Sequence, residues 1–345
     1  MGHLEREGLF GKTLEGLHVI VEQMGLPRYV AGQIASWLYK KQISSIDEMT
    51  NLSARVRGAL GERFVLGLAD PVSFQESVDG TKKYLYQAGQ GKFVEAAYIP
   101  DEERATLCIS SQVGCKMGCL FCMTGRQGFQ GQLTAGEILN QVHRLPEREK
   151  LTNVVYMGMG EPFDNLEEVL RSIEILTANW GYGWSPRRIT VSTIGIIPAM
   201  QEFLNRTQAH LAVSLHTPFP EERRMLMPVE KVYPLSEVIE TIRSFDWGRQ
   251  RRISFEYILF KGLNDTPAHV KELARVLNKV RCRINLIRFH PIPDTSLQGS
   301  DDQTVLAFKD ALTKKGILTT VRASRGQDIW AACGLLSTRE IVRKA

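Results

Sequence analysis

Hydrophobic residues in the amino-terminal part of the chain recur at helical spacing. Leu14, Leu17 and Val21 form one such stripe, and a second stripe follows the break at Pro27. Apolar positions that repeat every three or four residues predict amphipathic helices. We therefore expect residues 14–66 to form a small helical region.

Residues 72–98 instead alternate between apolar and polar side chains. A period of two is typical of a strand with one buried face. Asp79-Gly80 lies within this stretch, and that dipeptide is a strong signal for a tight turn between antiparallel strands. The sequence predicts a β-hairpin here.

From about residue 105 onward, short β-rich runs alternate with helical stretches. This alternation predicts parallel strands joined by crossover helices, arranged as an open sheet or as a partial or full barrel. The expected strands are 105–111, 153–158, 188–193, 210–215, 253–260, 283–289 and 317–322. The expected helices lie near 134–145, 166–178, 197–205, 235–245, 267–279 and 302–315. In such folds the chemistry collects at the carboxyl ends of the strands.

Composition excludes several classes of protein. Of the 345 residues, 43% are hydrophobic and 23% are charged, and the net charge is +5; these values are ordinary for a globular protein with a large core. No apolar run approaches the ~18 residues of a membrane span, and the amino terminus resembles neither a secretory signal nor a myristoylation site. We expect a soluble, cytoplasmic protein with no membrane partner, whose mild positive charge permits a polyanionic partner.

Three of the six cysteines fall on one short loop, Cys115-Lys-Met-Gly-Cys119-Leu-Phe-Cys122. Without a secretory signal, clustered cysteines more often bind metal than form disulfides. Three thiolates can hold a cubane [4Fe-4S] cluster and leave one iron open to the amino and carboxylate groups of S-adenosylmethionine. One electron then cleaves a carbon–sulfur bond to give the 5′-deoxyadenosyl radical. The alternative is a zinc knuckle that borrows a distant fourth ligand.

Residues at the ends of later strands are candidate ligands for S-adenosylmethionine. Met157-Gly-Met-Gly-Glu161 is a glycine turn after a predicted strand, where backbone carbonyls can approach a ligand and Glu161 can accept hydrogen bonds from an ammonium group. Ser192 and Ser214-Leu215-His216 lie at two further strand ends. Each also has a simpler interpretation, as a tight turn, a capping hydroxyl or a buried histidine.

Together these motifs resemble the RlmN/Cfr family of radical S-adenosylmethionine RNA methyltransferases, over nearly the whole chain. The resemblance is carried by Cys108-Ile-Ser-Ser-Gln-Val-Gly-Cys115 and the rest of the cysteine loop, Gly158-Met-Gly-Glu-Pro, Arg187-Arg-Ile-Thr-Val-Ser-Thr, Leu211-Ala-Val-Ser-Leu-His and Arg325-Gly-Gln-Asp-Ile-Trp-Ala-Ala-Cys333-Gly. It implies an α/β fold of three parts. These are a helical RNA-binding domain at 1–70, a β-hairpin extension at 71–104 and a partial (β/α) barrel at 105–345.

The resemblance also implies an activity. Members of the RlmN branch methylate carbon 2 of one adenosine in the peptidyl transferase centre of 23S ribosomal RNA, and of the adenosine 3′ of the anticodon in some transfer RNAs. The implied cofactors are a [4Fe-4S] cluster and two molecules of S-adenosylmethionine per turnover. The implied partners are those RNAs and an electron donor such as flavodoxin, and the protein is expected to be a monomer.

Roles for isolated residues follow from the same resemblance. Carbon 2 of adenine is electron-poor and does not attack a sulfonium methyl group directly. Cys333 matches a cysteine that first takes the methyl group, which a radical then activates for addition to adenine. Cys108 matches the cysteine that releases the product through a transient disulfide with Cys333, and Glu95 matches the general base that removes the proton from carbon 2. The implied S-adenosylmethionine contacts are Gly160, Glu161, Ser192, Ser214, Leu215 and His216.

One segment departs from the family pattern. The chain has Arg288-Phe-His290-Pro where many relatives have asparagine in a Trp-Asn-Pro segment, and we expect His290 to hydrogen-bond the adenine or ribose instead. Asn285-Leu-Ile-Arg and Ser192-Thr-Ile-Gly-Ile-Ile-Pro are similar to the Cfr branch, which methylates carbon 8 of the same adenosine. Met123-Thr-Gly-Arg-Gln-Gly-Phe and Arg322-Ala-Ser-Arg-Gly are closer to RlmN. Carbon 2 is our prediction, and carbon 8 is the alternative.

RNA binding is a separate expectation. Its candidates are paired cations for phosphate contacts and aromatic residues for base stacking. They are Arg187-Arg188, Arg223-Arg224, Arg249-Gln-Arg251-Arg252, Lys314-Lys315, Tyr182, Trp184 and Trp330. Cys282 is expected to be a structural thiol. Two other classes stay open: a radical enzyme that acts directly on a small molecule or protein, and a zinc- or cluster-bearing RNA-binding module without activity.

Overall fold

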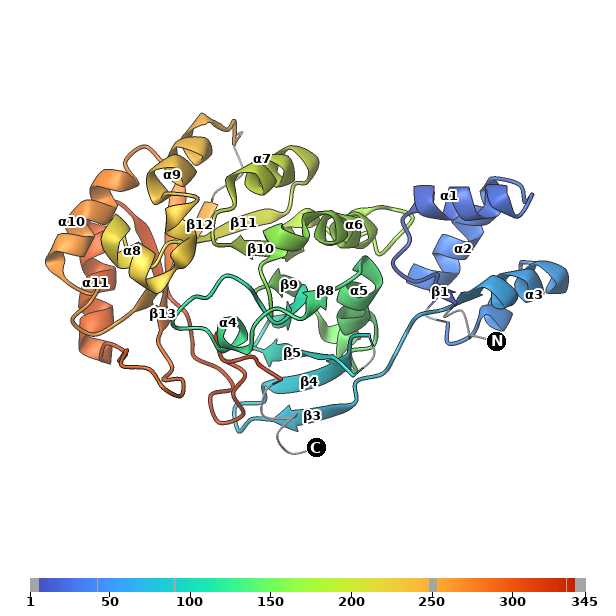
Figure 1. Ribbon diagram of the computed structural model, residues 1–345, viewed down its shortest axis with the longest axis horizontal. Helices are drawn as coiled ribbons and strands as arrows, with labels where there is room; N and C mark the ends of the chain where they lie inside the picture. Colours follow the sequence, from blue (N-terminus) through green and yellow to red (C-terminus); the bar gives the residue numbers. More distant parts are fainter. Residues whose placement is uncertain (1–5, 42, 90, 248–252, 333, 339–345) are drawn as a thin grey trace.

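The computed structural model describes residues 6–41, 43–89, 91–247, 253–332 and 334–338. Its centre is a ten-stranded sheet in the order β14-β13-β12-β11-β10-β9-β6-β5-β4-β3 (Figure 1). The parallel strands follow one another in chain order. They are β6 (Ala105–Ile109), β9 (Asn153–Tyr156), β10 (Ile189–Thr193), β11 (His210–Ser214), β12 (Ile253–Leu259), β13 (Cys282–Arg288) and β14 (Leu318–Val321). Because β14 and β3 are the two ends of the sheet, the barrel is partial.

Helices cover the outer face of this curved sheet (Figure 1). They are α5 (Ala135–His143), α6 (Leu166–Thr177), α7 (Ile197–Arg206), α9 (Leu235–Ser244), α10 (Pro267–Val276) and α11 (Asp302–Lys314). Each of these helices and each parallel strand was expected from the sequence, within three residues at either end. Two short helices were missed, α4 (Met123–Gln127) and α8 (Pro220–Leu226), because helices this short contain too few residues to show a hydrophobic period.

The predicted hairpin forms the antiparallel end of the same sheet. Strands β3 (Ser73–Glu76) and β4 (Lys82–Gln87) pair around the turn at Asp79-Gly80, and β5 (Phe93–Pro100) pairs with both β4 and β6. Gly80 has a φ of +81°, a conformation that favours glycine. The hairpin therefore continues the barrel wall.

The amino-terminal region lies at one end of the molecule (Figure 1). It contains α1 (Leu14–Gln23), α2 (Tyr29–Tyr39) and α3 (Ala54–Arg63), together with the short strands β1 (Glu7–Gly8) and β2 (Phe64–Val65). The side chains of Thr13 and Ser53 accept hydrogen bonds from the first turns of α1 and α3, which is a favourable way to begin a helix. No helix among the described residues is both long and apolar enough to cross a membrane.

Close backbone packing joins this helical region to the barrel. A Cβ atom at Gly136 of α5 would lie 2.6 Å from the carbonyl oxygen of Phe10. Asn140, one turn further along α5, donates a 2.8 Å hydrogen bond to the carbonyl of Ala69 and accepts one of 3.1 Å from its amide. The approach of the two parts therefore requires glycine at position 136.

We predict that G136A destabilises this junction by about 1–3 kcal/mol, because the added methyl group overpacks it. The expected result is a lower melting temperature and faster proteolytic cleavage between residues 66 and 73. Gly32 in α2 is the matched control, since a Cβ there would meet nothing within 4 Å. G32A should stabilise the helix by up to about 1 kcal/mol. Equal melting curves for the two variants would contradict the packing argument.

Candidate active site

The cysteine loop follows β6 and the short strand β7 (Gln112–Val113), at the carboxyl edge of the parallel strands. Cys122 directly precedes α4, and its amide donates to the carbonyl of Cys119 at 3.2 Å. Burial raises the pKa of the Cys115 thiol to about 12, and Cys122 adds to the shift. Burial also raises the pKa of Cys119 well above its usual value, with further contributions from Cys122 and Cys115. The three thiols therefore lie close enough to influence one another.

The donor set of this loop fits an iron–sulfur cluster. Thiolates are the ligands of such clusters, and binding must displace the protons that the raised pKa values favour on Cys115 and Cys119. Phe121 and Met123 are buried beside them in an apolar cluster with Phe260 and Phe289. Among the described residues, no three His, Cys, Asp or Glu side chains converge on a position for a single metal ion.

Glu161 links the ends of two strands. It is almost fully buried, its Oε1 accepts a 3.0 Å hydrogen bond from Phe163 N, and its Oε2 accepts one of 3.0 Å from Ile194 N. Burial raises the pKa of Glu161 to about 7, against opposing hydrogen bonds that include one from Thr193. Each oxygen has a second lone pair, so the carboxylate can hold this junction and still accept from a ligand. Gly160, with a φ of +102°, makes the preceding turn.

His216 follows β11 and faces the cysteine loop. Its backbone is left-handed, with a φ of +58°, and its ring meets that of Phe121 edge-on with centroids 4.8 Å apart. Nδ1 accepts a 3.0 Å hydrogen bond from Ile258 N, which assigns the ring proton to Nε2. Burial, with a smaller effect from Arg223, lowers the pKa of His216 to about 3. The imidazole is therefore neutral and presents an N–H donor.

Two buried residues hold these strand ends in place, a role that the sequence did not indicate for either. Arg223 is ion-paired with Glu230 and donates to the carbonyls of Ile194 and Ser214 at 2.9 and 3.3 Å. Asn264 donates to the carbonyl of His216 at 2.6 Å. No local signal marks either residue, because an arginine pair or a lone asparagine looks the same in the sequence whether it is buried or exposed.

The remaining predicted ligands lie on the same edge. Ser192 is half-buried near the end of β10, Leu215 is fully buried, and His290 is half-buried just after β13. Burial lowers the pKa of His290, and Arg288 adds to this effect. This shift favours the neutral imidazole, which can form a hydrogen bond with a nucleoside.

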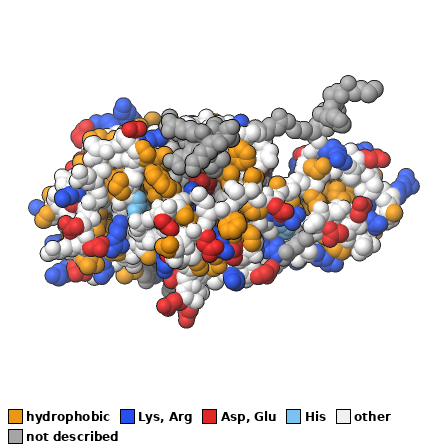
Figure 2. All heavy atoms as spheres, turned by 90° about the horizontal axis from the view of Figure 1, so that it is seen from below, with side chains coloured by type: hydrophobic (Ala, Val, Ile, Leu, Met, Phe, Trp, Pro, Cys, Tyr) orange, Lys and Arg blue, Asp and Glu red, His pale blue; other side chains and the backbone are white. Residues whose placement is uncertain are grey.

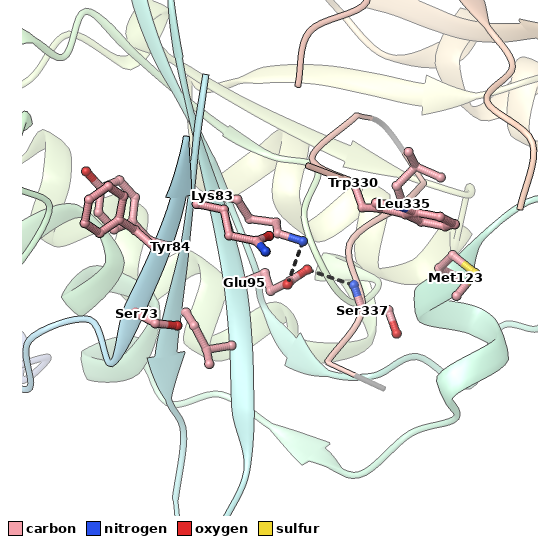
Figure 3. A pocket seen from close by; sticks show the side chains of 11 residues that line it. Ser73, Lys83, Tyr84, Glu95, Met123, Trp330, Leu335 and Ser337 are labelled. Carbon is pink, nitrogen blue, oxygen red and sulfur yellow. Dashed lines mark hydrogen bonds and ion pairs between the residues drawn. The ribbon is translucent and has the colours of Figure 1, made fainter. Parts of the chain in front are cut away.

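Glu95 lies on β5, beside the parallel strands, and is only 2% exposed. Its Oε1 lies 3.1 Å from Nζ of Lys83 on β4, and its Oε2 accepts a 2.9 Å hydrogen bond from Ser337 N (Figure 3). Lys83 compensates the buried carboxylate. The predicted general base is thus tied to the carboxyl-terminal segment, which we define as residues 326–338.

The carboxyl-terminal segment crosses from the end of the barrel to α4 and the antiparallel strands (Figure 1). The carbonyl of Gly334 accepts a 2.8 Å hydrogen bond from Met123 N, and that of Leu336 accepts one of 2.7 Å from the Thr124 hydroxyl. Met123 directly follows the last cysteine of the loop. Two hydrogen bonds therefore hold the segment against the start of α4.

Cys108, on β6, is buried in a small apolar cluster that also contains Ala97 and Ala331. Cys333 lies outside the described residues. Its neighbour Ala332 belongs to the apolar cluster of Phe121. The chain on either side of position 333 therefore contacts both the surroundings of Cys108 and the cysteine loop.

The structure corrects part of the RNA-binding expectation. Arg223 is fully buried and therefore is not a phosphate contact. Arg188 is half-buried, and it already donates to the carbonyls of Leu151 and Thr152. Lys314 and Lys315 are exposed, and residues 249, 251 and 252 lie outside the described residues. On the face shown in Figure 2, basic side chains are interspersed with acidic ones, and charge alone marks no RNA surface there.

The three aromatic candidates for base stacking differ in their surroundings. The Tyr182 hydroxyl lies 2.6 Å from Nδ1 of His143 in the interior, and the guanidinium of Arg188 covers Trp184 at 3.9 Å from the ring centroid. Of the three, Trp330 is the one that lines a cavity together with Glu95. Cys282 is a partly buried thiol at the amino end of β13, away from the carboxyl ends of the strands.

Comparison with known proteins places this geometry in a family. Residues 109–277 match the family model of the radical SAM superfamily, and residues 8–66 match the ribosomal RNA large subunit methyltransferase N-terminal domain. A protein of Phocaeicola vulgatus named probable dual-specificity RNA methyltransferase RlmN is 56% identical over 96% of this chain and 95% of its own. The dual-specificity RNA methyltransferase RlmN of Syntrophus aciditrophicus is 41% identical over 99% of each chain.

A solved structure of a related protein has the same fold. The crystal structure of a radical SAM methyltransferase from Sphaerobacter thermophilus matches with a TM-score of 0.89 and 39% identity, over 96% of this chain and 99% of that chain. Both the fold and the resemblance expected from the sequence are confirmed. This chain belongs to the RlmN family of the radical SAM superfamily.

Proposed function

We propose that this protein methylates carbon 2 of an adenosine in the peptidyl transferase centre of 23S ribosomal RNA and of the adenosine 3′ of the anticodon in transfer RNA, by way of an S-methylated Cys333. The observation that supports this most is the path of the carboxyl-terminal segment. Gly334 is hydrogen-bonded to the residue after Cys122, and Ala331 packs in the cluster of Cys108. The described residues on either side of position 333 thereby contact the end of the cysteine loop and the surroundings of a second cysteine.

In this proposal Cys115, Cys119 and Cys122 hold a [4Fe-4S] cluster, which supplies the electron that cleaves S-adenosylmethionine to a radical. The strand-end residues bind the S-adenosylmethionine molecules, two per turnover. They are Gly160, Glu161, Ser192, Ser214, Leu215, His216 and His290. The neutral His216 donates through Nε2 and so recognises an acceptor. The domain at 1–70 binds RNA, an electron donor such as flavodoxin reduces the enzyme, and the enzyme acts as a monomer in the cytoplasm.

The three remaining residues handle the methyl group and the proton. The Cys333 thiolate attacks the methyl carbon of the sulfonium, S-adenosylhomocysteine leaves with the electron pair of the broken bond, and Cys333 becomes a thioether. The 5′-deoxyadenosyl radical takes a hydrogen atom from this S-methyl group, and the resulting methylene radical adds to carbon 2 of adenine. The adduct would return one electron to the oxidised cluster, and Glu95 accepts the proton from carbon 2. Each oxygen of Glu95 has a partner in the protein and a second lone pair, so the carboxylate can accept this proton while both partners stay in place.

The Cys108 thiolate then attacks the sulfur of Cys333. The electron pair of the broken sulfur–carbon bond stays on the RNA-linked carbon, which takes up a proton to become the methyl group. A transient Cys108–Cys333 disulfide remains until a reductant supplies two electrons.

The metal content tests the first part of this proposal. Anaerobically reconstituted protein should contain about four iron and four sulfide per chain, with visible absorption that dithionite bleaches, and C119A should lose both. C282A is the matched control and should keep the full content, since Cys282 lies on β13 outside the loop. Stoichiometric zinc in place of iron would contradict the proposal and favour a zinc knuckle.

The order of steps makes a second prediction. C333A should abolish RNA methylation, whereas C108A should accumulate RNA covalently attached to Cys333, because the step that releases the product is lost. Gel mobility and peptide mass spectrometry detect the adduct, and C282A should turn over normally. An active C333A enzyme would point instead to a radical enzyme that abstracts hydrogen directly from its substrate.

The position of the methyl group needs its own measurement. Nucleoside mass spectrometry of RNA treated with the wild-type enzyme should show 2-methyladenosine. Appearance of 8-methyladenosine instead would assign the chain to the Cfr-like reaction, and the absence of both would defeat the proposed function.

A further inference from the structure

Trp330 lines a cavity between the antiparallel strands and the carboxyl-terminal segment. The cavity has a volume of about 200 Å³, and Lys83, Glu95, Met123 and Leu335 also line it. Figure 3 shows Trp330, Leu335 and Met123 on one side and the Lys83–Glu95 ion pair on the other. Trp330 keeps 36% of its surface exposed, so part of the indole can contact a molecule that enters the cavity.

The backbone of Trp330 is in a strained conformation. Its φ is +56°, a left-handed value that bulky residues rarely adopt because it costs free energy. Two hydrogen bonds enforce this conformation: Trp330 N donates to the carbonyl of Gln327 at 3.1 Å, and Ala331 N donates to that of Gly326 at 2.8 Å. Strain that the surrounding structure maintains is typical of functional positions.

The turn of the β3–β4 hairpin anchors the same loop. Asp328 accepts hydrogen bonds from the Ser77 hydroxyl at 2.5 Å and from Val78 N at 3.2 Å. Asp79 accepts one from Gly326 N at 2.9 Å. Although burial acts in the opposite direction, hydrogen bonds such as this one lower the pKa of Asp79 to about 2. Both anchors come from one hairpin, and they hold the loop that carries Trp330 in place.

We propose that Trp330 is the stacking surface for the target adenine, which enters this cavity after leaving its own RNA stack, and that Lys83 positions Glu95 at the opposite wall. This inference rests on the proposed function. A base in folded RNA must be extruded before carbon 2 is accessible, and an aromatic side chain then replaces the lost stacking. The indole on one side of the cavity can stack on the face of a purine. The carboxylate on the other side can accept a proton from the edge of that purine.

The test compares W330A and W330F with the wild type, using transfer RNA as substrate. Loss of a base–aromatic stack should raise the KM for transfer RNA about tenfold or more in W330A with a smaller change in kcat, and W330F should recover most of the loss. Methylation of Cys333 in the absence of RNA, measured by peptide mass spectrometry, should be unchanged in both variants. L318A is the control, because Leu318 is an exposed apolar residue on β14 that does not line the cavity.

A direct readout uses transfer RNA with 2-aminopurine in place of the adenosine 3′ of the anticodon. Binding to the wild type and to W330F should quench its fluorescence through stacking, and binding to W330A should leave it bright. If the wild type methylates RNA and W330A matches it in KM and quenching, the role of Trp330 is wrong and the proposed function stands. If W330A fails to methylate Cys333, Trp330 supports the segment and not the base, which also overturns the inference. A wild type that forms no methyladenosine would overturn the proposed function itself.

Discussion

The hydrogen bond from Thr124 to the carbonyl of Leu336 joins residues that are 212 positions apart, and the site depends on such contacts. Together with the Met123–Gly334 and Glu95–Ser337 hydrogen bonds, it brings the end of the chain across the cysteine loop and onto the antiparallel strands. Without these contacts the barrel would still present its strand ends. The residues on either side of position 333 would then be held neither beside Cys108 nor beside Glu95.

Buried polar groups set the shape of the strand ends beneath this segment. Arg223, Glu161 and Asn264 are almost fully buried, and each is hydrogen-bonded to backbone atoms of more than one segment. Burying such groups is costly unless they are paired, so removing one partner leaves an uncompensated group in the interior. Their arrangement fixes the carbonyls and amides near the glycine turn and His216, and a ligand there meets a preorganised backbone.

Regular hydrophobic patterns made the fold predictable, whereas most of the site was not predictable from local patterns. Helices such as α6 and strands such as β12 show clear periodicity, and Asp79-Gly80 marks its turn. The cysteine spacing identified the cluster loop because that chemistry needs three thiolates close together. By contrast, the sequence shows no difference between buried Arg223 and exposed Arg187, and it gives no sign that Lys83 and Ser337 meet Glu95. Those facts come from tertiary contacts between segments far apart in the chain. The resemblance to a family supplied Cys108, Glu95 and Cys333, whose local surroundings look like an ordinary strand or a small-residue turn.

The central claim is that position 333 lies within reach of Cys108 above the cysteine loop. Mild oxidation of cluster-loaded C282A protein tests this most directly, because a disulfide forms only when the two Cα atoms approach within about 7 Å. Mass spectrometry of non-reduced peptides should show a single dominant cross-link, between residues 108 and 333. If Cys333 stays reduced while the protein is folded and loaded, or pairs only between molecules, the two sulfurs do not meet and the methyl-relay account is wrong.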